Sequence, residues 1–447
     1  MARLDALLSR LRAGLYHGEV PELDEAVVDA AYVPELTVPT AGGFEAPAMP
    51  REQVPSSAVP AAGPASSADV HRGYLDQAVV GYLVYGVAAA TAFLVVQLSL
   101  SDTQAGLYSS ALAMGIVLAG LLSHRLDRLA GMKAVHFVAL GLLGLAAFLI
   151  ALGPVFIVTL GGAAAVGLGG GLLLGHVNQM MAAGGGALAR VRIARSTLVA
   201  MISSVTVPLV IGIGVATGIG WQLAFVPAAL LAGVALAATR GFVDRPVSSV
   251  VERSRLPGYF WVAWLLVMLV VAIEFAAVFW SSTLVQRRTG VSLGEATLVI
   301  SALVGGVIAG RVALSSHAVS DRDPVWLMRG GIVVGMVGLL LPWASTSFEL
   351  AMLGILIAGL GLGVLYPLAA SITLAFAPSH LLRASGLLVL ASGLAILVAP
   401  LVLGIVADVT GVVSAWLLIP AICLVALALT VPVARGRDSR SVEAAST

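Results

Sequence analysis

The hexapeptide Pro208-Leu-Val-Ile-Gly-Ile213 returns 192 residues further along the chain as Pro400-Leu-Val-Leu-Gly-Ile405. At the same offset, Gly167-Leu-Gly169 returns as Gly359-Leu-Gly361. Weaker glycine matches keep this order at offsets of 190 and 194, and they pair Gly115 and Gly120 with Gly305 and Gly310, and Gly141 and Gly144 with Gly335 and Gly338. Self-similarity at a nearly fixed offset indicates that the chain contains two related halves.

Long apolar runs surround both copies of the repeat. The chain has 447 residues, of which 59% are hydrophobic and 11% are charged, whereas about a quarter of an ordinary soluble domain is charged. A run of ~20 apolar residues crosses the roughly 30 Å of hydrocarbon in a bilayer. We expect twelve such spans, at 78–100, 104–123, 134–152, 155–177, 196–218, 221–238, 258–283, 293–314, 326–345, 350–374, 385–407 and 412–433.

The predicted fold class is therefore all-α, a polytopic membrane protein with twelve transmembrane helices in two six-helix halves. The repeat offset equals six spans, so the halves share one orientation and are related by an axis along the membrane normal. Basic residues in short loops set the orientation in the membrane. With both termini inside, the inner side holds 22 of the 24 Lys and Arg residues, and the outer side holds only Arg287 and Arg288. We therefore predict that both termini are cytoplasmic.

The segments outside the spans have a different composition. The two halves, 73–238 and 257–433, are joined by a cytoplasmic loop at 239–256 and flanked by tails at 1–72 and 434–447. The first tail begins with leucines on one helical face and continues as an acidic stretch rich in Pro and Ala. We expect an amphipathic start on the membrane surface, followed by disorder, because the rest has too little apolar surface to fold.

Composition and motifs exclude several function classes. The net charge of +1 gives no basic surface for nucleic acid. Cys423 is the only cysteine, so no disulfide or thiolate metal site can form within one chain. The sequence has no phosphate-binding Gly-x-x-x-x-Gly-Lys-Ser/Thr loop, and the spans lack paired carboxylates or a metal-spaced His and Glu. We expect no catalytic residues, no metal and no cofactor, and hence no enzyme.

The two-half order and two loop motifs resemble the major facilitator superfamily over residues 73–433. That superfamily commonly carries a Gly-x-x-x-Asp-Arg-x-Gly-Arg-Lys-like loop after its second span. Here Gly120-Leu-Leu-Ser-His-Arg-Leu-Asp-Arg-Leu-Ala-Gly-Met-Lys133 is similar to a degenerate copy. The eighth span ends in a second echo, at Gly310-Arg311 and Asp321-Arg322. The resemblance implies the fold of that superfamily and the activity of a solute transporter.

The same resemblance implies a gate at the cytoplasmic helix ends, where an acid and Arg residues bridge the two halves. His124 stands where the family usually places its acid, so Asp127 is the candidate to replace it. The candidate gate consists of Gly120, His124, Arg125, Asp127, Arg128, Gly310, Arg311, Asp321 and Arg322. The alternative is that these charges only anchor the loops.

Glu274 is the only acid well inside any predicted span. Its context, Glu274-Phe-Ala-Ala-Val-Phe-Trp280, resembles many actinobacterial-type facilitator proteins, and the helical rise places it in the outer half of the seventh span. A charge at that depth costs at least about 2.5 kcal/mol, so a protonatable acid facing a water-filled cavity is the leading interpretation. Glu274 is the candidate proton-coupling residue. The alternative is a pair with Arg287 or Arg288, or a bond to a neighbouring helix.

Other polar residues lie in spans that line the central cavity of the resembling family. The candidate substrate residues are Tyr82, Tyr85, Gln97, His176, Asn178, Trp280 and Tyr366. Each of them, taken singly, is also consistent with a packing role. Pro208, Pro367 and Pro400 interrupt helical hydrogen bonds and are the predicted bending points.

These features predict a secondary active transporter of the cytoplasmic membrane, which moves a small, weakly polar solute by alternating access with proton coupling. At a distance the chain resembles drug and metabolite exporters and members of the fucose-permease type. Export is favoured because an apolar cavity suits a weakly polar solute. The alternatives are proton-coupled uptake of a sugar-like or other small solute, and a non-transporting membrane receptor or regulator. The expected partners are the solute, protons and the lipid bilayer, and we expect a monomer.

Overall fold

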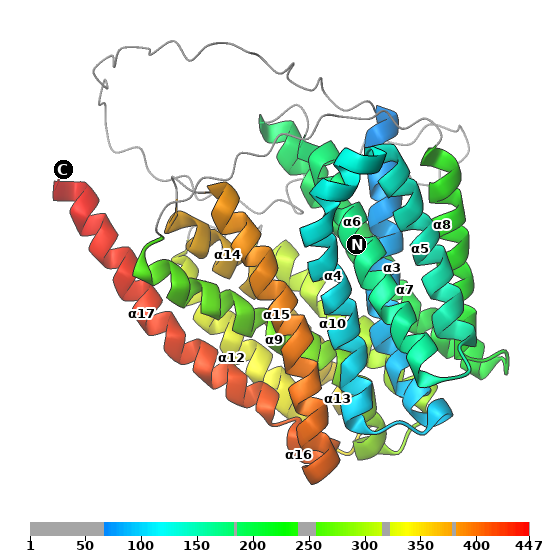
Figure 1. The fold of residues 1–447 in the computed structure, drawn as a ribbon. Helices are drawn as coiled ribbons and strands as arrows, with labels where there is room; N and C mark the ends of the chain where they lie inside the picture. Colours follow the sequence, from blue (N-terminus) through cyan, green and yellow to red (C-terminus); the bar gives the residue numbers. More distant parts are fainter. Residues whose placement is uncertain (1–66, 183–185, 240–255, 315–321, 378–380, 447) are drawn as a thin grey trace, which may run out of the picture.

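The computed structural model describes residues 67–182, 186–239, 256–314, 322–377 and 381–446. Within these residues, twelve helical segments are long and apolar enough to cross a membrane, which confirms the predicted all-α polytopic fold (Figure 1). The predicted amphipathic start and disordered stretch before Ser67, most of the 239–256 loop, and Asp321 lie outside the described residues.

The helices follow the predicted spans closely. The N-terminal half contains α3 (Ser67–Leu98), α4 (Asp102–Ala130), α5 (Met132–Leu152), α6 (Phe156–Ala182), α7 (Gly186–Ala216), the short η1 (Trp221–Ala224) and α8 (Phe225–Ala238). The C-terminal half contains α9 (Gly258–Thr289), α10 (Leu293–Leu314), α12 (Pro324–Ala344), α13 (Phe348–Gly363), α14 (Leu365–Ala375), α15 (Leu381–Thr410), α16 (Val412–Ala415) and α17 (Leu418–Ser446).

Two features differ from the predicted organisation. The tenth span is broken between α13 and α14. Pro367 lies three residues after the break, and proline lacks the N–H that would continue the helical hydrogen bonds across it. Pro208 and Pro400 instead lie inside continuous helices, α7 and α15. The segment 434–447, predicted as a tail, is helical as far as Ser446, where it extends α17.

The repeat is visible in how glycines pack. In the N-terminal half, Gly115 on α4 packs against Gly167 on α6, and in the C-terminal half Gly306 on α10 packs in the same way against Gly359 on α13. The predicted match of Gly115 with Gly305 is therefore wrong by one residue, and Gly305 faces open space. A step of one residue turns the side chain about 100° around the helix, so only Gly306 faces the partner helix.

The remaining glycine matches also occupy unlike places. Gly141 and Gly120 face open space, whereas Gly335 packs on Leu362 and Gly310 packs on the backbone of α13. These pairs kept the order of the repeat without sharing a structural role. The pairs at an offset of 192 are the ones that share contacts between helices.

We expect Gly167→Ala and Gly359→Ala to destabilise the protein. A Cβ at either position would collide with a backbone carbonyl, that of Leu112 or Leu303, and overpacking of this kind costs about 1–3 kcal/mol. Gly141→Ala is the matched control, because its Cβ would meet nothing within 4 Å. Thermal unfolding in detergent should show a lower Tm for the first two variants only. Equal Tm values for all three would contradict the close packing of α4 on α6 and of α10 on α13.

The two halves meet through equivalent hydrogen bonds. The Ser110 hydroxyl on α4 donates to the carbonyl of Leu397 on α15 at 2.6 Å. The Ser301 hydroxyl on α10 donates to the carbonyl of Val205 on α7 at 2.8 Å. Figure 1 shows that the helices of the two halves converge toward the end that holds α16 and fan apart toward the end where α3 begins. The helices of the two halves therefore diverge toward the predicted cytoplasmic side.

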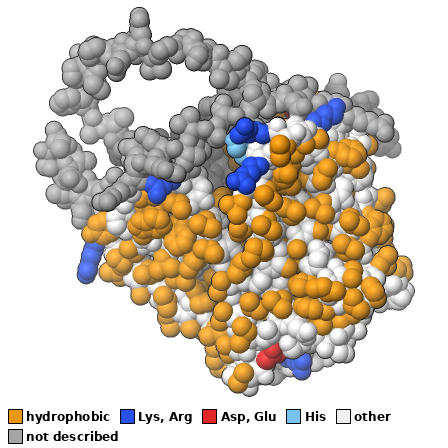
Figure 2. Space-filling view, in the orientation of Figure 1, with side chains coloured by type: hydrophobic (Ala, Val, Ile, Leu, Met, Phe, Trp, Pro, Cys, Tyr) orange, Lys and Arg blue, Asp and Glu red, His pale blue; other side chains and the backbone are white. Residues whose placement is uncertain are grey.

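The surface fits the predicted orientation. Figure 2 shows hydrophobic side chains across the middle of the visible face and most of its Lys and Arg side chains near the end where α3 begins. We expect epitope tags at the first and last residues of the chain to be reachable only from the cytoplasm, and a tag beside Arg288 only from outside. Protease protection in right-side-out and inverted vesicles measures this. Termini on opposite sides would contradict the twelve-span topology.

Candidate functional site

Glu274 lies at the midpoint of α9, because the helix continues to Thr289, beyond the predicted end of the span. The residue is 8% exposed, and its Oε1 accepts a hydrogen bond of 3.4 Å from the hydroxyl of Tyr85 on α3. Arg288 is directed elsewhere, since its Nε donates to the carbonyl of Ser345. The contact of Glu274 with Tyr85 joins the C-terminal half to the N-terminal half.

Arg311 and Tyr366 belong to the same site. The charge of Arg311 on α10 acts on Glu274, Tyr85 and Tyr366, and the hydroxyl of Tyr366 on α14 interacts with Ser392 on α15. The Arg311 side chain also crosses to the N-terminal half, where its Nη1 donates to the Met201 sulfur at 3.3 Å. Thioether sulfur is a weak acceptor. The structure thus brings Tyr85, Glu274 and Tyr366 together and adds Arg311, which the sequence assigned to the gate.

Four of the predicted substrate residues lie away from Glu274, and three of them make other contacts. Tyr82 is buried inside the N-terminal half and donates to the carbonyl of Ala224 at 2.8 Å. Gln97 accepts from the indole of Trp221. Trp280 is buried and donates to the carbonyl of Pro400 at 3.0 Å. Asn178 is exposed near the end of α6. Tyr82, Gln97 and Trp280 therefore stabilise helix packing, and none of the four lies in the Glu274 site.

The described residues of the predicted gate have different surroundings, and Asp321 lies outside the described part of the chain. Asp127 at the end of α4 accepts from His176 Nε2 on α6 at 3.0 Å, so both partners belong to the N-terminal half. His176 is accordingly not a residue of the Glu274 site. Arg322 is exposed and lines a groove of about 710 Å³ between α10, α12 and α13. His124, Arg125 and Arg128 are exposed at the same end of the molecule.

Sequence reasoning missed a contact at the end of the molecule that holds α16. The carboxylate of Asp408, at the end of α15, accepts from the backbone N–H groups of Asp102 and Thr103 at 2.7 and 3.0 Å. These N–H groups begin α4, so a side chain of the C-terminal half caps a helix of the N-terminal half. Backbone donors leave no pattern in a sequence. We call the contact of Asp408 with Asp102 and Thr103 the outer latch.

Two more missed residues accompany His176. His136 on α5 faces the ring of His176, and its Nε2 lies 3.2 Å from Asp76 Oδ2 on α3. Neither Asp76 nor His136 was among the candidate residues of the sequence analysis. Their positions in separate spans gave no spacing signal.

Comparisons with known proteins agree with the fold. A family model described as Major Facilitator Superfamily matches residues 314–446. The comparison with curated proteins found no match. Among solved structures, the POT family transporter PepTSo is similar, with a TM-score of 0.69, 11% identity, and coverage of 83% of this chain and 98% of that chain.

Two further structures are similar over most of the chain. The nucleoside transporter NupG gives a TM-score of 0.66 at 14% identity and covers 82% of this chain and 98% of its own. A bacterial homologue of the human lysosomal transporter Spinster, in an inward-facing and unoccupied conformation, gives 0.64 at 15% identity and covers 83% and 98%. At such identities the likeness concerns the fold.

Proposed function

We propose that the chain is a membrane transporter of the major facilitator type, that it moves a small solute across the cell membrane by alternating access, and that Glu274 is its proton-binding residue; the family model over residues 314–446 and the likeness of fold support this. The observation that carries this proposal is the hydrogen bond from Tyr85 to Glu274, because it joins the two halves at a protonatable group. Export is the direction that we propose.

Protonation of Glu274 changes the contact between the halves. An ionised carboxylate is a strong acceptor for the Tyr85 hydroxyl, and hydrogen bonds to ionised groups are about twice as strong as neutral ones. A proton on Glu274 removes this charge and so weakens the bond across the interface. A ligand shifts a conformational equilibrium only through its different affinities for the two states. The proton meets this condition, because the Tyr85 contact depends on how the halves are placed.

Arg311 indicates what the solute carries. Its Nε is buried without a hydrogen-bond partner, and within the described residues no carboxylate lies at ion-pair distance from its guanidinium. A buried donor without a partner costs about 1–3 kcal/mol or more. We propose that a small, otherwise weakly polar solute fills this place with a hydrogen-bond acceptor such as a carboxylate or carbonyl. One acceptor beside the hydroxyls of Tyr85 and Tyr366 suits such a solute.

Proteoliposomes with an imposed pH gradient test the proposal. Vesicles should be loaded with a panel of monocarboxylates, nucleosides, short peptides, sugars and lipophilic drugs, because structures with this fold include nucleoside and proton-dependent oligopeptide transporters. We expect gradient-driven movement of at least one acceptor-bearing solute, with export favoured. Movement only into the cytoplasmic compartment would establish uptake instead. No movement of any panel member under either gradient, in protein that stays folded, would contradict the proposal.

A further inference from the structure

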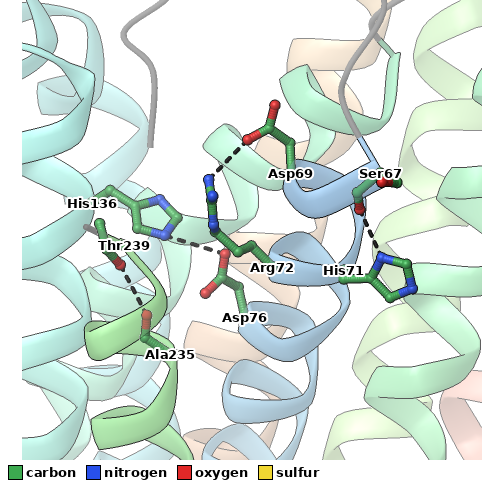
Figure 3. A network of polar contacts seen from close by, with 8 residues as sticks. All are labelled: Ser67, Asp69, His71, Arg72, Asp76, His136, Ala235 and Thr239. Carbon is green, nitrogen blue, oxygen red and sulfur yellow. Dashed lines mark hydrogen bonds and ion pairs between the residues drawn. The ribbon is translucent and has the colours of Figure 1, made fainter. Parts of the chain in front are cut away.

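Four titratable side chains from four helices meet inside the N-terminal half, near the end where α3 begins. They are Asp76 on α3, Asp127 on α4, His136 on α5 and His176 on α6, and none of these side chains is more than 3% exposed. Figure 3 shows His136 and Asp76 facing each other. Ionisable groups buried inside membrane-spanning bundles are costly, and they mark pairs or proton pathways.

The four side chains form a linear chain. His176 Nε2 lies 3.0 Å from Asp127 Oδ1, the two Nδ1 atoms lie 3.4 Å apart, and His136 Nε2 lies 3.2 Å from Asp76 Oδ2. The last contact is at ion-pair distance but is not aligned as a hydrogen bond. The imidazole planes differ by 12° and their centroids are 5.6 Å apart, so the Nδ1 atoms point at each other along the line between the rings. Because each nitrogen faces a different partner, the cluster does not converge on a metal ion.

Counting the protons that the contacts among these four side chains require gives the protonation of the cluster. Each neutral imidazole carries one N–H, so two neutral rings supply two protons. The four side chains make three contacts in a row: Asp76 with His136, His136 with His176, and His176 with Asp127. The two hydrogen-bonded contacts need one proton each, and the ion-pair contact of His136 with Asp76 needs a proton on Nε2 that makes the imidazole cationic. Without a third proton, two nitrogen lone pairs would face each other at 3.4 Å, or a ring nitrogen would face a carboxylate without a proton between them.

We propose that Asp76, His136, His176 and Asp127 form a proton-binding site that is separate from Glu274. In the arrangement that the structure shows, this site holds one proton more than two carboxylates and two neutral imidazoles carry. The proton joins α5 to α6 through the two rings, and the flanking carboxylates extend the tie to α3 and α4. The site has a net charge of −1 in this state and −2 after the proton leaves.

The charges that act on His176 are those of Asp127, His136 and Asp76. On α3, Asp69 pairs with Arg72 at 2.9 Å, in the direction of the helix start. Lys133 on α5 is exposed. The charges of Arg192 and Arg195 on α7 act on Tyr74. Thr239, just after α8, donates to the carbonyl of Ala235. The two carboxylates therefore provide the negative charge that retains the proton.

Solid-state ¹⁵N NMR tests this proposal directly. The chain has seven histidines, and the full-length protein can be labelled with ¹⁵N-histidine and placed in proteoliposomes at pH 7. We expect three of the four ring nitrogens of the pair to be protonated, and a correlation between two Nδ1 atoms across a shared proton. His136→Gln should abolish this correlation. His71→Gln is the matched control, because His71 is exposed on α3 and its Nδ1 hydrogen-bonds the carbonyl of Ser67.

A second variant covers the case in which His136→Gln does not fold. Asp76→Asn keeps both rings but removes one negative charge, so the third proton should leave at a lower pH than in the wild type. Two protonated nitrogens out of four at pH 7, or a correlation that persists in His136→Gln, would overturn the proposal. The spectra need no transport, so the result is independent of whether Glu274 couples flux to protons.

Discussion

Glu274→Gln is expected to reduce pH-gradient-driven accumulation of the solute to the level of empty vesicles. Gln keeps the size of the side chain and can still accept a hydrogen bond from Tyr85, but it cannot ionise. The Tyr85 contact between the halves then no longer depends on a proton. Exchange of solute down its own gradient should survive, because a permanently neutral side chain mimics protonated Glu274. Parallel flux assays with and without a pH gradient separate the two effects.

Two further variants, Glu295→Gln and Glu274→Asp, serve as controls for this prediction. Glu295→Gln changes an exposed acid at the start of α10 that binds only Ser292, and it should leave driven flux unchanged. Glu274→Asp should keep partial coupling with a shifted pH optimum, because its shorter side chain moves the charge by about one bond length. Normal uphill transport by Glu274→Gln with the wild-type pH profile would make Glu274 a structural residue.

Asp408→Ala is expected to open the outer side. The substitution removes both acceptor contacts of the outer latch, which join Asp408 to the first N–H groups of α4. Loss of a capping carboxylate costs about 1 kcal/mol, which corresponds to a shift of ~fivefold between two states. A cysteine at Ser110 reports the change, because Ser110 contacts Leu397 of the other half about 12 Å below the latch. An impermeant maleimide applied from outside should label it several times faster.

Asp323→Ala is the matched control for the latch. Asp323 also caps a helix, since it accepts from the N–H groups of Val325 and Trp326, but its contacts stay within the C-terminal half. Native Cys423 is 1% exposed and adds little background. Equal labelling rates in Asp408→Ala and the wild type would show that the latch does not hold the halves together.

The fold could be predicted from the sequence because its signals are local. Apolar runs of the right length gave every span, and Pro208 with Pro400 gave the repeat. The finer glycine matches failed because order along the chain does not say which face of a helix a residue occupies. Gly305 and Gly306 are neighbours in the sequence, yet only Gly306 packs against Gly359.

The site could be predicted only in part. A lone acid in an apolar span singled out Glu274, and its aromatic neighbours in space, Tyr85 and Tyr366, were among the candidates. Arg311 was assigned to the gate because it stands beside a loop motif, whereas the length of its side chain lets its charge act on Glu274. The pairing of His136 with His176 depends on how α5 lies against α6. No spacing within one helix encodes that contact.

The central claim is that two halves rock around the Glu274 site. Double electron–electron resonance measures this with two pairs of exposed positions: Ile219 with Val409 at the outer end, and Leu129 with Trp326 at the cytoplasmic end. When the pH is moved across the titration of Glu274, the account predicts that one distance lengthens while the other shortens, and that Glu274→Gln removes this response. Distances that change in the same direction, or that do not respond to pH in a protein that transports, would contradict the account.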